Sequence, residues 1–196
     1  MCFSPWMTAL RHAGLVALAY GCASAAGLKE RGEYQTALRA LADGLPQVAA
    51  LKFERLLQDG SLTRMESGQV AERLADALVR SKQPDKALVA LTFFEIPDAG
   101  FWKAQALMLQ GKFREAEAEL RSYLNSKDAH HKDLAGLALG QVLIGQGREN
   151  AGRKELKELA ESQDADVARL SRLWANESEA FSGRSEAILR RLARTG

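Results

Sequence analysis

Two adjacent histidines, His130 and His131, are the first residues of this chain to suggest chemistry, because Asp128 and Asp133 flank them. Imidazole nitrogens and carboxylate oxygens are ligands for Zn²⁺ and related ions. Adjacent side chains point in different directions, however, and the stretch is typical of a loop before a helix. Capping of that helix by Asp128, or simple solvation of these charges, is therefore the favoured interpretation, and we expect neither a metal nor another cofactor.

A short segment near the C-terminus allows one test of an enzymatic function. Residues 177–181, Glu-Ser-Glu-Ala-Phe, are similar to the Glu-Ser segment of lytic transglycosylases, whose catalytic domains can follow helical solenoids. The phenylalanine is displaced by one residue and only 15 residues follow it, so we expect an exposed acidic helix end. The sequence also contains no phosphate loop, G-x-S-x-G elbow or H-E-x-x-H helix. We therefore predict no catalytic residues and no enzymatic activity.

Composition narrows the class of protein further. The chain has 196 residues, of which 46% are hydrophobic, and this length allows a sizeable core. Its 27 basic and 25 acidic residues give a formal net charge of +2. Because basic and acidic residues also alternate along the predicted helices, we expect no nucleic-acid partner.

The N-terminal segment, residues 1–26, has the three-part pattern of a cleaved signal peptide. Arg11 precedes a short apolar run, and a cluster of small residues follows with an Ala-Ser-Ala element that ends at Ala25. We expect cleavage after this element or one residue later, and export to the periplasm. Two alternatives remain: a lipid anchor on Cys22, which is the one case in which we expect membrane attachment, or an ordinary buried first helix.

The body of the chain is helix-like and repetitive. It is rich in Ala, Leu, Glu, Lys and Arg, with apolar residues three and four apart. Four turn positions are equivalent: Gly44, Lys82, Gly111 and Gly147. Small residues lie seven positions before each turn (Ala37, Ala75, Ala104, Gly140) and five positions after it (Ala49, Ala87, Ala116, Gly152).

This spacing predicts pairs of antiparallel helices. The turns lie 38, 29 and 36 residues apart, with a mean near 34. Small side chains at the crossing allow the two helices of a pair to approach closely, and neighbouring pairs must stack to cover the remaining apolar faces. Glycine at the end of the first helix and Pro46 or Pro84 at the start of the second helix suit such turns.

Residues 101–107 with 111–116 and Leu120 resemble a tetratricopeptide repeat, and the resemblance extends over residues 30–163. It implies an all-α solenoid, a right-handed superhelix of four helix pairs. Residues 164–196 are expected to form a degenerate fifth unit that caps the C-terminal end.

The resemblance also implies a function, because tetratricopeptide solenoids commonly bind a peptide or protein segment in a groove lined by the first helices. The groove positions in this register are Arg31, Tyr34, Gln69, Glu72, Asp76, Arg80, Phe101, Gln105, Met108 and Gln141. The alternative for the large apolar residues is packing against the neighbouring unit. We expect a non-catalytic interaction or scaffold module of the bacterial cell envelope. The alternative function is an accessory or truncated part of a larger envelope enzyme, such as a lytic transglycosylase system.

Overall fold

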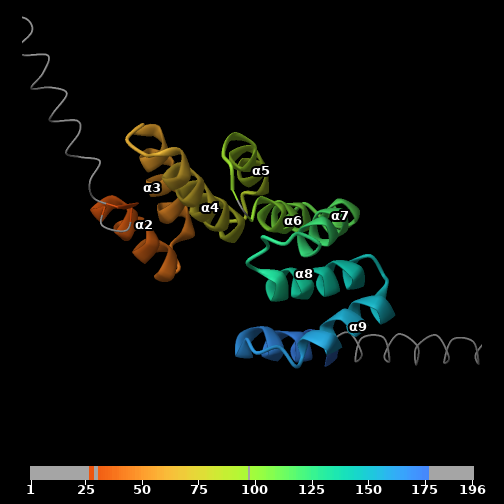
Figure 1. The fold of residues 1–196 in the computed structure, drawn as a ribbon. Helices are drawn as coiled ribbons and strands as arrows, with labels where there is room; N and C mark the ends of the chain where they lie inside the picture. Colours follow the sequence, from red (N-terminus) through yellow and green to blue (C-terminus); the bar gives the residue numbers. More distant parts are fainter. Residues whose placement is uncertain (1–26, 29–30, 97, 177–196) are drawn as a thin grey trace, which may run out of the picture.

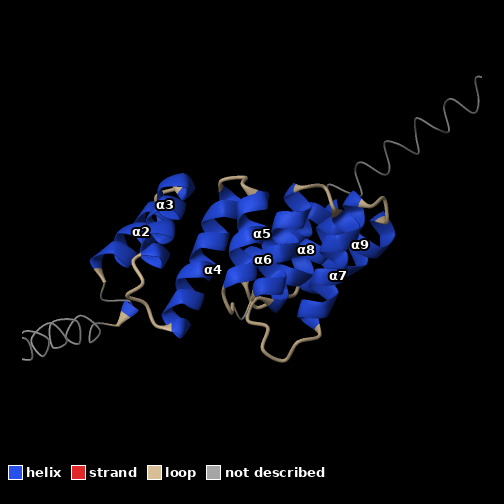
Figure 2. Cartoon of the chain, turned by 90° about the horizontal axis from the view of Figure 1, so that it is seen from above, coloured by secondary structure: helices blue, strands red, loops and turns tan. Residues whose placement is uncertain are grey.

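The computed structural model describes residues 27–28, 31–96 and 98–176. Helices make up about three quarters of this part, and it contains no strand, which confirms the all-α prediction (Figures 1 and 2). The helices are α2 (Gly32–Ala42), α3 (Pro46–Gln58), α4 (Arg64–Arg80), α5 (Pro84–Phe93), α6 (Ala99–Leu109), α7 (Phe113–Leu124), α8 (Lys132–Gly145) and α9 (Glu149–Leu159). Residues 165–176 form a further helical stretch.

The expected signal peptide, residues 1–26, and the end of the fifth unit lie outside the described residues, as does the segment 177–181. Among the helices that are described, none combines the length and the apolar character needed to cross a membrane.

The four predicted turn positions share one backbone geometry. The φ angle is +74° at Gly44, +57° at Lys82, +72° at Gly111 and +78° at Gly147. In each turn the N–H of the following residue donates to the carbonyl oxygen four residues before the turn position, at 2.9–3.0 Å: Leu45 to Ala40, Gln83 to Leu78, Lys112 to Leu107 and Arg148 to Leu143. This bond satisfies a carbonyl at the helix end that has no partner within the helix. The predicted turn positions are therefore confirmed.

The helices of each pair cross at the predicted small residues. Six alanines at these positions are completely buried: Ala37, Ala49, Ala75, Ala87, Ala104 and Ala116. The crossing of α8 and α9 is closer still, because a Cβ atom on Gly152 would lie 2.6 Å from the carbonyl oxygen of Gly140. Alanine would not fit at this crossing without a backbone shift, which explains why glycine occupies both positions.

The helix pairs follow one another along the chain (Figure 1). Each helix from α2 to α9 packs against the next, and α4 also contacts α2 and α6, while α6 contacts α8. The first helices of the pairs therefore form a continuous layer, flanked by the second helices. The arrangement is consistent with an α-solenoid.

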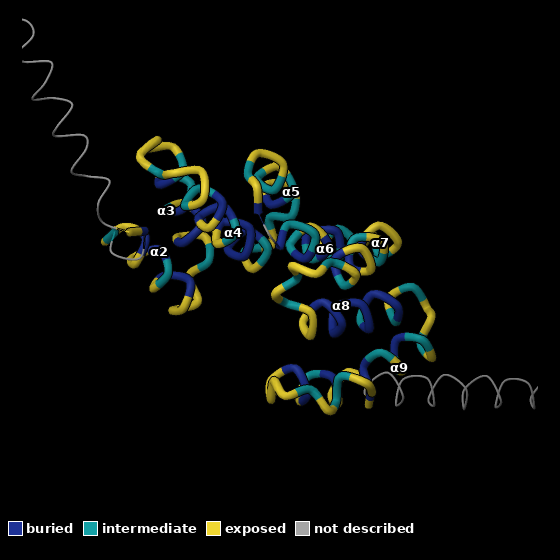
Figure 3. Tube along the Cα trace, viewed as in Figure 1, coloured by how far each residue is buried: buried dark blue, intermediate teal, exposed yellow. Residues whose placement is uncertain are grey.

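The core is divided along this array. One buried cluster extends from α2 to α6 and includes Phe53, a second lies around Leu120 and Leu139, and a third surrounds Leu156. Figure 3 shows α8 buried along most of its length, because α7 and α9 pack on either side of it. The core is thus distributed between neighbouring helix pairs.

Candidate functional site

Two of the predicted groove residues, Tyr34 and Phe101, belong to the core. Tyr34 is 7% exposed and its ring packs against that of Phe53, with the centroids 6.0 Å apart. Phe101 is 5% exposed and contacts the rings of Trp102 and Tyr123. Their assignment as groove anchors is wrong. The alternative of packing is correct for Phe101, and Tyr34 is buried as well. The reason is that each ring fills the space between successive helices, where stacking buries it.

Asp76 is a further groove residue that the structure buries. Its carboxylate accepts a hydrogen bond from Nε of Arg80 at 2.6 Å, one helical turn away on α4. The guanidinium side chain itself remains 59% exposed. Asp76 therefore positions Arg80, and Arg80 is the member of this pair that can meet a partner.

The remaining predicted groove residues differ in exposure and in contacts. Gln69 is exposed, whereas Arg31 donates to the hydroxyl of Ser61 at 2.8 Å and so joins α2 to the loop before α4. Met108 packs against the cluster that contains Phe101. Five of the predicted groove residues are partly buried: Arg31, Glu72, Gln105, Met108 and Gln141.

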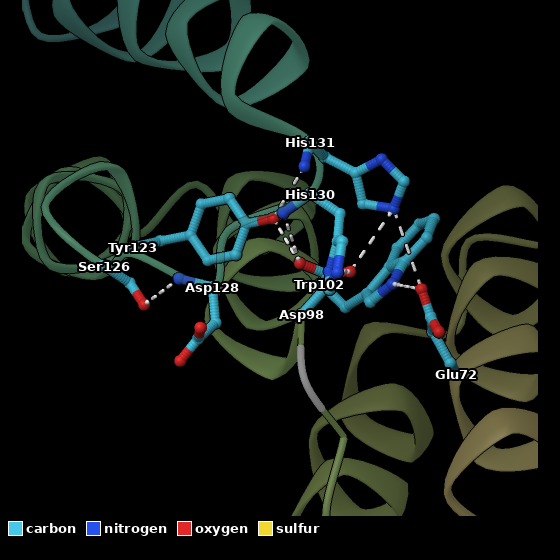
Figure 4. A network of polar contacts seen from close by, with 8 residues as sticks. All are labelled: Glu72, Asp98, Trp102, Tyr123, Ser126, Asp128, His130 and His131. Atoms are coloured by element: carbon cyan, nitrogen blue, oxygen red, sulfur yellow. Dashed lines mark hydrogen bonds and ion pairs between the residues drawn. The ribbon is translucent and has the colours of Figure 1, made fainter.

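A polar cluster lies where α4, α6, α7 and the loop before α8 meet, and Asp98 is at its centre (Figure 4). Asp98 occupies the N-cap position of α6 but makes no side-chain bond to that helix. Its Oδ1 atom instead accepts hydrogen bonds from the hydroxyl of Tyr123 and, at 3.2 Å, from the backbone N–H of His130. Because Asp98 is 3% exposed, these hydrogen bonds are what keeps a buried carboxylate satisfied.

The other oxygen of Asp98, Oδ2, faces two imidazoles. Nε2 of His131 lies 3.6 Å from it and 3.7 Å from Oε1 of Glu72, which projects from α4. Nδ1 of His130 lies 3.2 Å from the same Asp98 oxygen. Figure 4 shows the indole of Trp102 beside this group, with Nε1–H donating to Oε1 of Glu72 at 3.5 Å. Three successive helix pairs thus contribute side chains to one cluster.

The pKa values reflect this environment. Burial would raise the pKa of Asp98, but the hydrogen bonds from Tyr123 and His130 and the neighbouring imidazoles lower it below its usual value. Burial and the hydrogen bond to Asp98 raise the pKa of Tyr123 to about 12. At neutral pH the pair is therefore an ionised carboxylate that accepts a hydrogen bond from a neutral phenol.

The two histidines thus have partners other than those expected from their sequence neighbours. Asp128 is exposed and does not cap α8, whose N-cap residue is His131. The backbone N–H of Asp128 donates instead to Ser126 Oγ. Asp133 accepts a hydrogen bond from Ser162. Capping by Asp128 is therefore wrong, and the carboxylates that meet the imidazoles come from the two preceding helix pairs.

An apolar groove lies on the other side of the array, between α3 and α5, which both pack on α4 (Figure 1). Its volume is about 550 Å³. Leu74 and Leu78 of α4 form its buried floor, and Val89 and Phe93 of α5 line it although they are 56% and 76% exposed. Apolar side chains this exposed, beside a hollow, are typical of an interaction surface.

The sequence contained a signal for the polar cluster. Thr63, Asp98 and His131 are the N-cap residues of α4, α6 and α8, and they lie 35 and 33 residues apart, close to the repeat length. Equivalent positions of neighbouring repeats come together when the repeats stack. Comparison of N-cap positions between repeats would therefore have brought Asp98 and His131 together.

Comparison with protein families, with curated proteins and with solved structures finds no match to this chain.

Proposed function

We propose that this protein is a non-catalytic interaction module that binds an apolar segment of another protein. The observation that carries the proposal is the groove between α3 and α5, where Val89 and Phe93 stay exposed beside an apolar floor. A pocket of a few hundred cubic ångströms with mostly apolar walls suits the side chains of a short peptide segment.

The charges around the groove define the partner's chemistry. Glu54 and Asp85 line it with a single basic residue, Lys86. The balance of these charges is acidic, so the bound segment carries apolar side chains for the floor and a basic residue for the edge. A large aromatic such as Phe93, exposed at the edge of a pocket, is the type of residue on which binding energy concentrates.

A peptide array tests this proposal. Short synthetic peptides with constant apolar positions and flanking charges that vary from basic to acidic are titrated against the full chain. We expect the basic series to bind and Phe93→Ser to weaken binding roughly tenfold or more. Leu109→Ser removes a comparably apolar residue, 45% exposed on α6 and outside the groove, and is expected to bind as the wild type does.

The same experiment separates the two candidate surfaces. Arg80→Glu changes the exposed cation of the first-helix layer without touching the groove. If Arg80→Glu weakens binding and Phe93→Ser does not, the partner occupies the first helices and the groove assignment is wrong. Binding of no peptide in either series contradicts the proposed function.

We further propose that the module is exported to the periplasm and acts in the bacterial cell envelope. The basis is the signal-like order of residues 1–26. Mass spectrometry of the chain recovered from the envelope fraction is expected to find an N-terminus at Ala26 or Gly27. An acylated Cys22 would support the lipid anchor instead, and a cytoplasmic chain that retains residues 1–26 would contradict export.

A further inference from the structure

The cluster of Glu72, Asp98 and His131 has the donor atoms and spacing of a metal site. One imidazole nitrogen and two carboxylate oxygens lie within 4.8 Å of one another. The Nε2 atom of His131 is 3.6 Å from Asp98 and 3.7 Å from Glu72. Ligands about 2.1 Å from a tetrahedral zinc ion are about 3.4 Å apart, so the two distances to His131 are within a few tenths of an ångström of coordinating separations.

The surrounding residues hold these ligands in place. Tyr123 and the backbone N–H of His130 bind the oxygen of Asp98 that faces away from the imidazole of His131, which leaves Oδ2 directed at it. The indole of Trp102 donates to Glu72. Hydrogen bonds of this kind, from outside the coordination sphere, orient the ligands in metal sites and raise their affinity.

The charge of the cluster also favours a cation. Within the described residues, no lysine or arginine forms an ion pair with Glu72 or Asp98; their ion-pair partners there are histidines. Two largely buried carboxylates, 17% and 4% exposed, thus lie on either side of one imidazole. Their combined negative charge would attract a divalent ion.

We propose that Glu72, Asp98 and His131 bind one divalent transition-metal ion of the Zn²⁺ type. The mixed nitrogen and oxygen set suits such an ion better than Mg²⁺ or Ca²⁺, which prefer oxygen ligands. The His131 side chain is 34% exposed, so the ion can be reached from solvent and can complete its shell with water. This assignment differs from our sequence-based expectation of no metal, because two of the ligands come from other helix pairs.

Bound there, the ion would join three successive helix pairs. Glu72 belongs to the pair of α4 and α5, Asp98 precedes α6, and His131 precedes α8. The contacts between pairs are otherwise made by packing and scattered polar bonds. A shared ligand set would therefore fix the relative orientation of the pairs, independently of any peptide bound in the groove between α3 and α5.

Zinc titration of the metal-free full chain, with a chromophoric chelator as competitor, tests the site. We expect one Zn²⁺ per chain, and at least a tenfold loss of affinity in Glu72→Gln and in His131→Ala. Co²⁺ in place of Zn²⁺ is expected to give a visible absorption band that disappears in His131→Ala. A large excess of Mg²⁺ is expected to leave Zn²⁺ bound.

A matched control distinguishes the site from nonspecific binding. Asp128→Asn removes a carboxylate that points away from the cluster in Figure 4. This variant is expected to bind Zn²⁺ within a few-fold of the wild type, and far-UV circular dichroism verifies that each variant is folded. Equal affinity of the wild type, Glu72→Gln and His131→Ala would overturn the proposal, as would displacement of Zn²⁺ by Mg²⁺.

Discussion

Lys82 occupies a backbone conformation that its three equivalents reach with glycine. Its φ of +57° lies in the left-handed region, where a Cβ atom crowds the following carbonyl. The hydrogen bond from Gln83 to Leu78 nevertheless forms at 2.9 Å, so the turn imposes its geometry on the lysine. A single unfavourable residue is tolerated because the helices on both sides of it are packed.

Replacing Lys82 by glycine is therefore expected to stabilise the protein. The gain is about 0.5 kcal/mol, because relief of the left-handed strain exceeds the extra chain entropy of glycine in the unfolded state. The converse change, Gly111→Ala, is expected to cost about 1 kcal/mol. Urea denaturation of both variants measures these changes, and destabilisation by Lys82→Gly would contradict the strain at this turn.

Phe101 yields a second prediction at this scale. Because the ring is 5% exposed and packs against two aromatic neighbours, Phe101→Ala should lower the free energy of unfolding by about 3–5 kcal/mol. Gln69→Ala, at an exposed position of the predicted groove, should change it by less than about 0.5 kcal/mol. A urea midpoint of Phe101→Ala equal to that of the wild type would contradict the assignment of Phe101 to the core.

At the scale of helices, the closest contact is the crossing of α8 and α9. Gly152→Ala would place a Cβ atom 2.6 Å from the carbonyl oxygen of Gly140, which is backbone and cannot rotate away. We expect a loss of about 1–3 kcal/mol, although alanine is the better helix former. A Cβ atom at Gly32 on α2 would meet no atom within 4 Å, so Gly32→Ala is expected to be neutral or slightly stabilising. Thermal denaturation of both variants measures these changes.

A carboxylate, Glu117, joins α7 to the turn before α9. It accepts hydrogen bonds from Arg121 at 2.9 Å, from Gln146 at 2.9 Å and from Arg148 at 2.9–3.0 Å. Burial would raise the pKa of Glu117, but these three donors lower it below its ordinary value of 4.5. The group therefore stabilises the fold above pH 4.5, and this stabilisation is lost as the pH falls through the lowered pKa.

Glu117→Gln tests this pH dependence. At pH 7 we expect it to lower the free energy of unfolding by about 1 kcal/mol, because the charge-assisted bonds are weakened. Below the folded-state pKa the wild-type carboxyl is also neutral, and the two proteins should converge. Denaturant titrations between pH 7 and pH 3 measure the difference; a constant difference over this range would exclude a contribution from the charge of Glu117.

At the scale of the whole molecule, the core is shared between successive helix pairs. Phe53 is completely buried in the cluster that extends from α2 to α6, whereas Leu120 lies in a second cluster, and Leu88 packs against both. In such arrays stability is the sum of local and nearest-neighbour contributions. Damage at one end should therefore remain close to that end.

Native-state hydrogen exchange of Phe53→Ala tests this expectation. We expect faster exchange of amides in α2 and α3, because the large cavity weakens the pair to which they belong. Amides of α7 and α8 should keep their wild-type protection. An equal loss of protection in all helices would show that the chain unfolds as one cooperative unit.

Most of the fold could be predicted from the sequence because it depends on local spacing. The turn glycines and the small crossing residues are read directly along the chain, and the structure has them where they were expected. The directions of the Tyr34 and Phe101 side chains could not be predicted in this way, since they depend on how the helices rotate against one another. The polar cluster depends on the same stacking, because Glu72 and His131 are 59 residues apart.

The N-cap residue of α6 has a consequence for how this chain can change in length. The side chain of Asp98 does not cap its own helix and bonds instead to Tyr123 on α7 and to the backbone of His130, just before α8 of the next helix pair. A helix pair added before α2 or after α9 leaves this contact intact. A pair inserted between α7 and α8 would carry His130 and His131 away from Asp98 and leave a buried carboxylate with fewer donors. Helix pairs can therefore be added at the ends of the array, whereas an insertion between α7 and α8 would break the contact of Asp98.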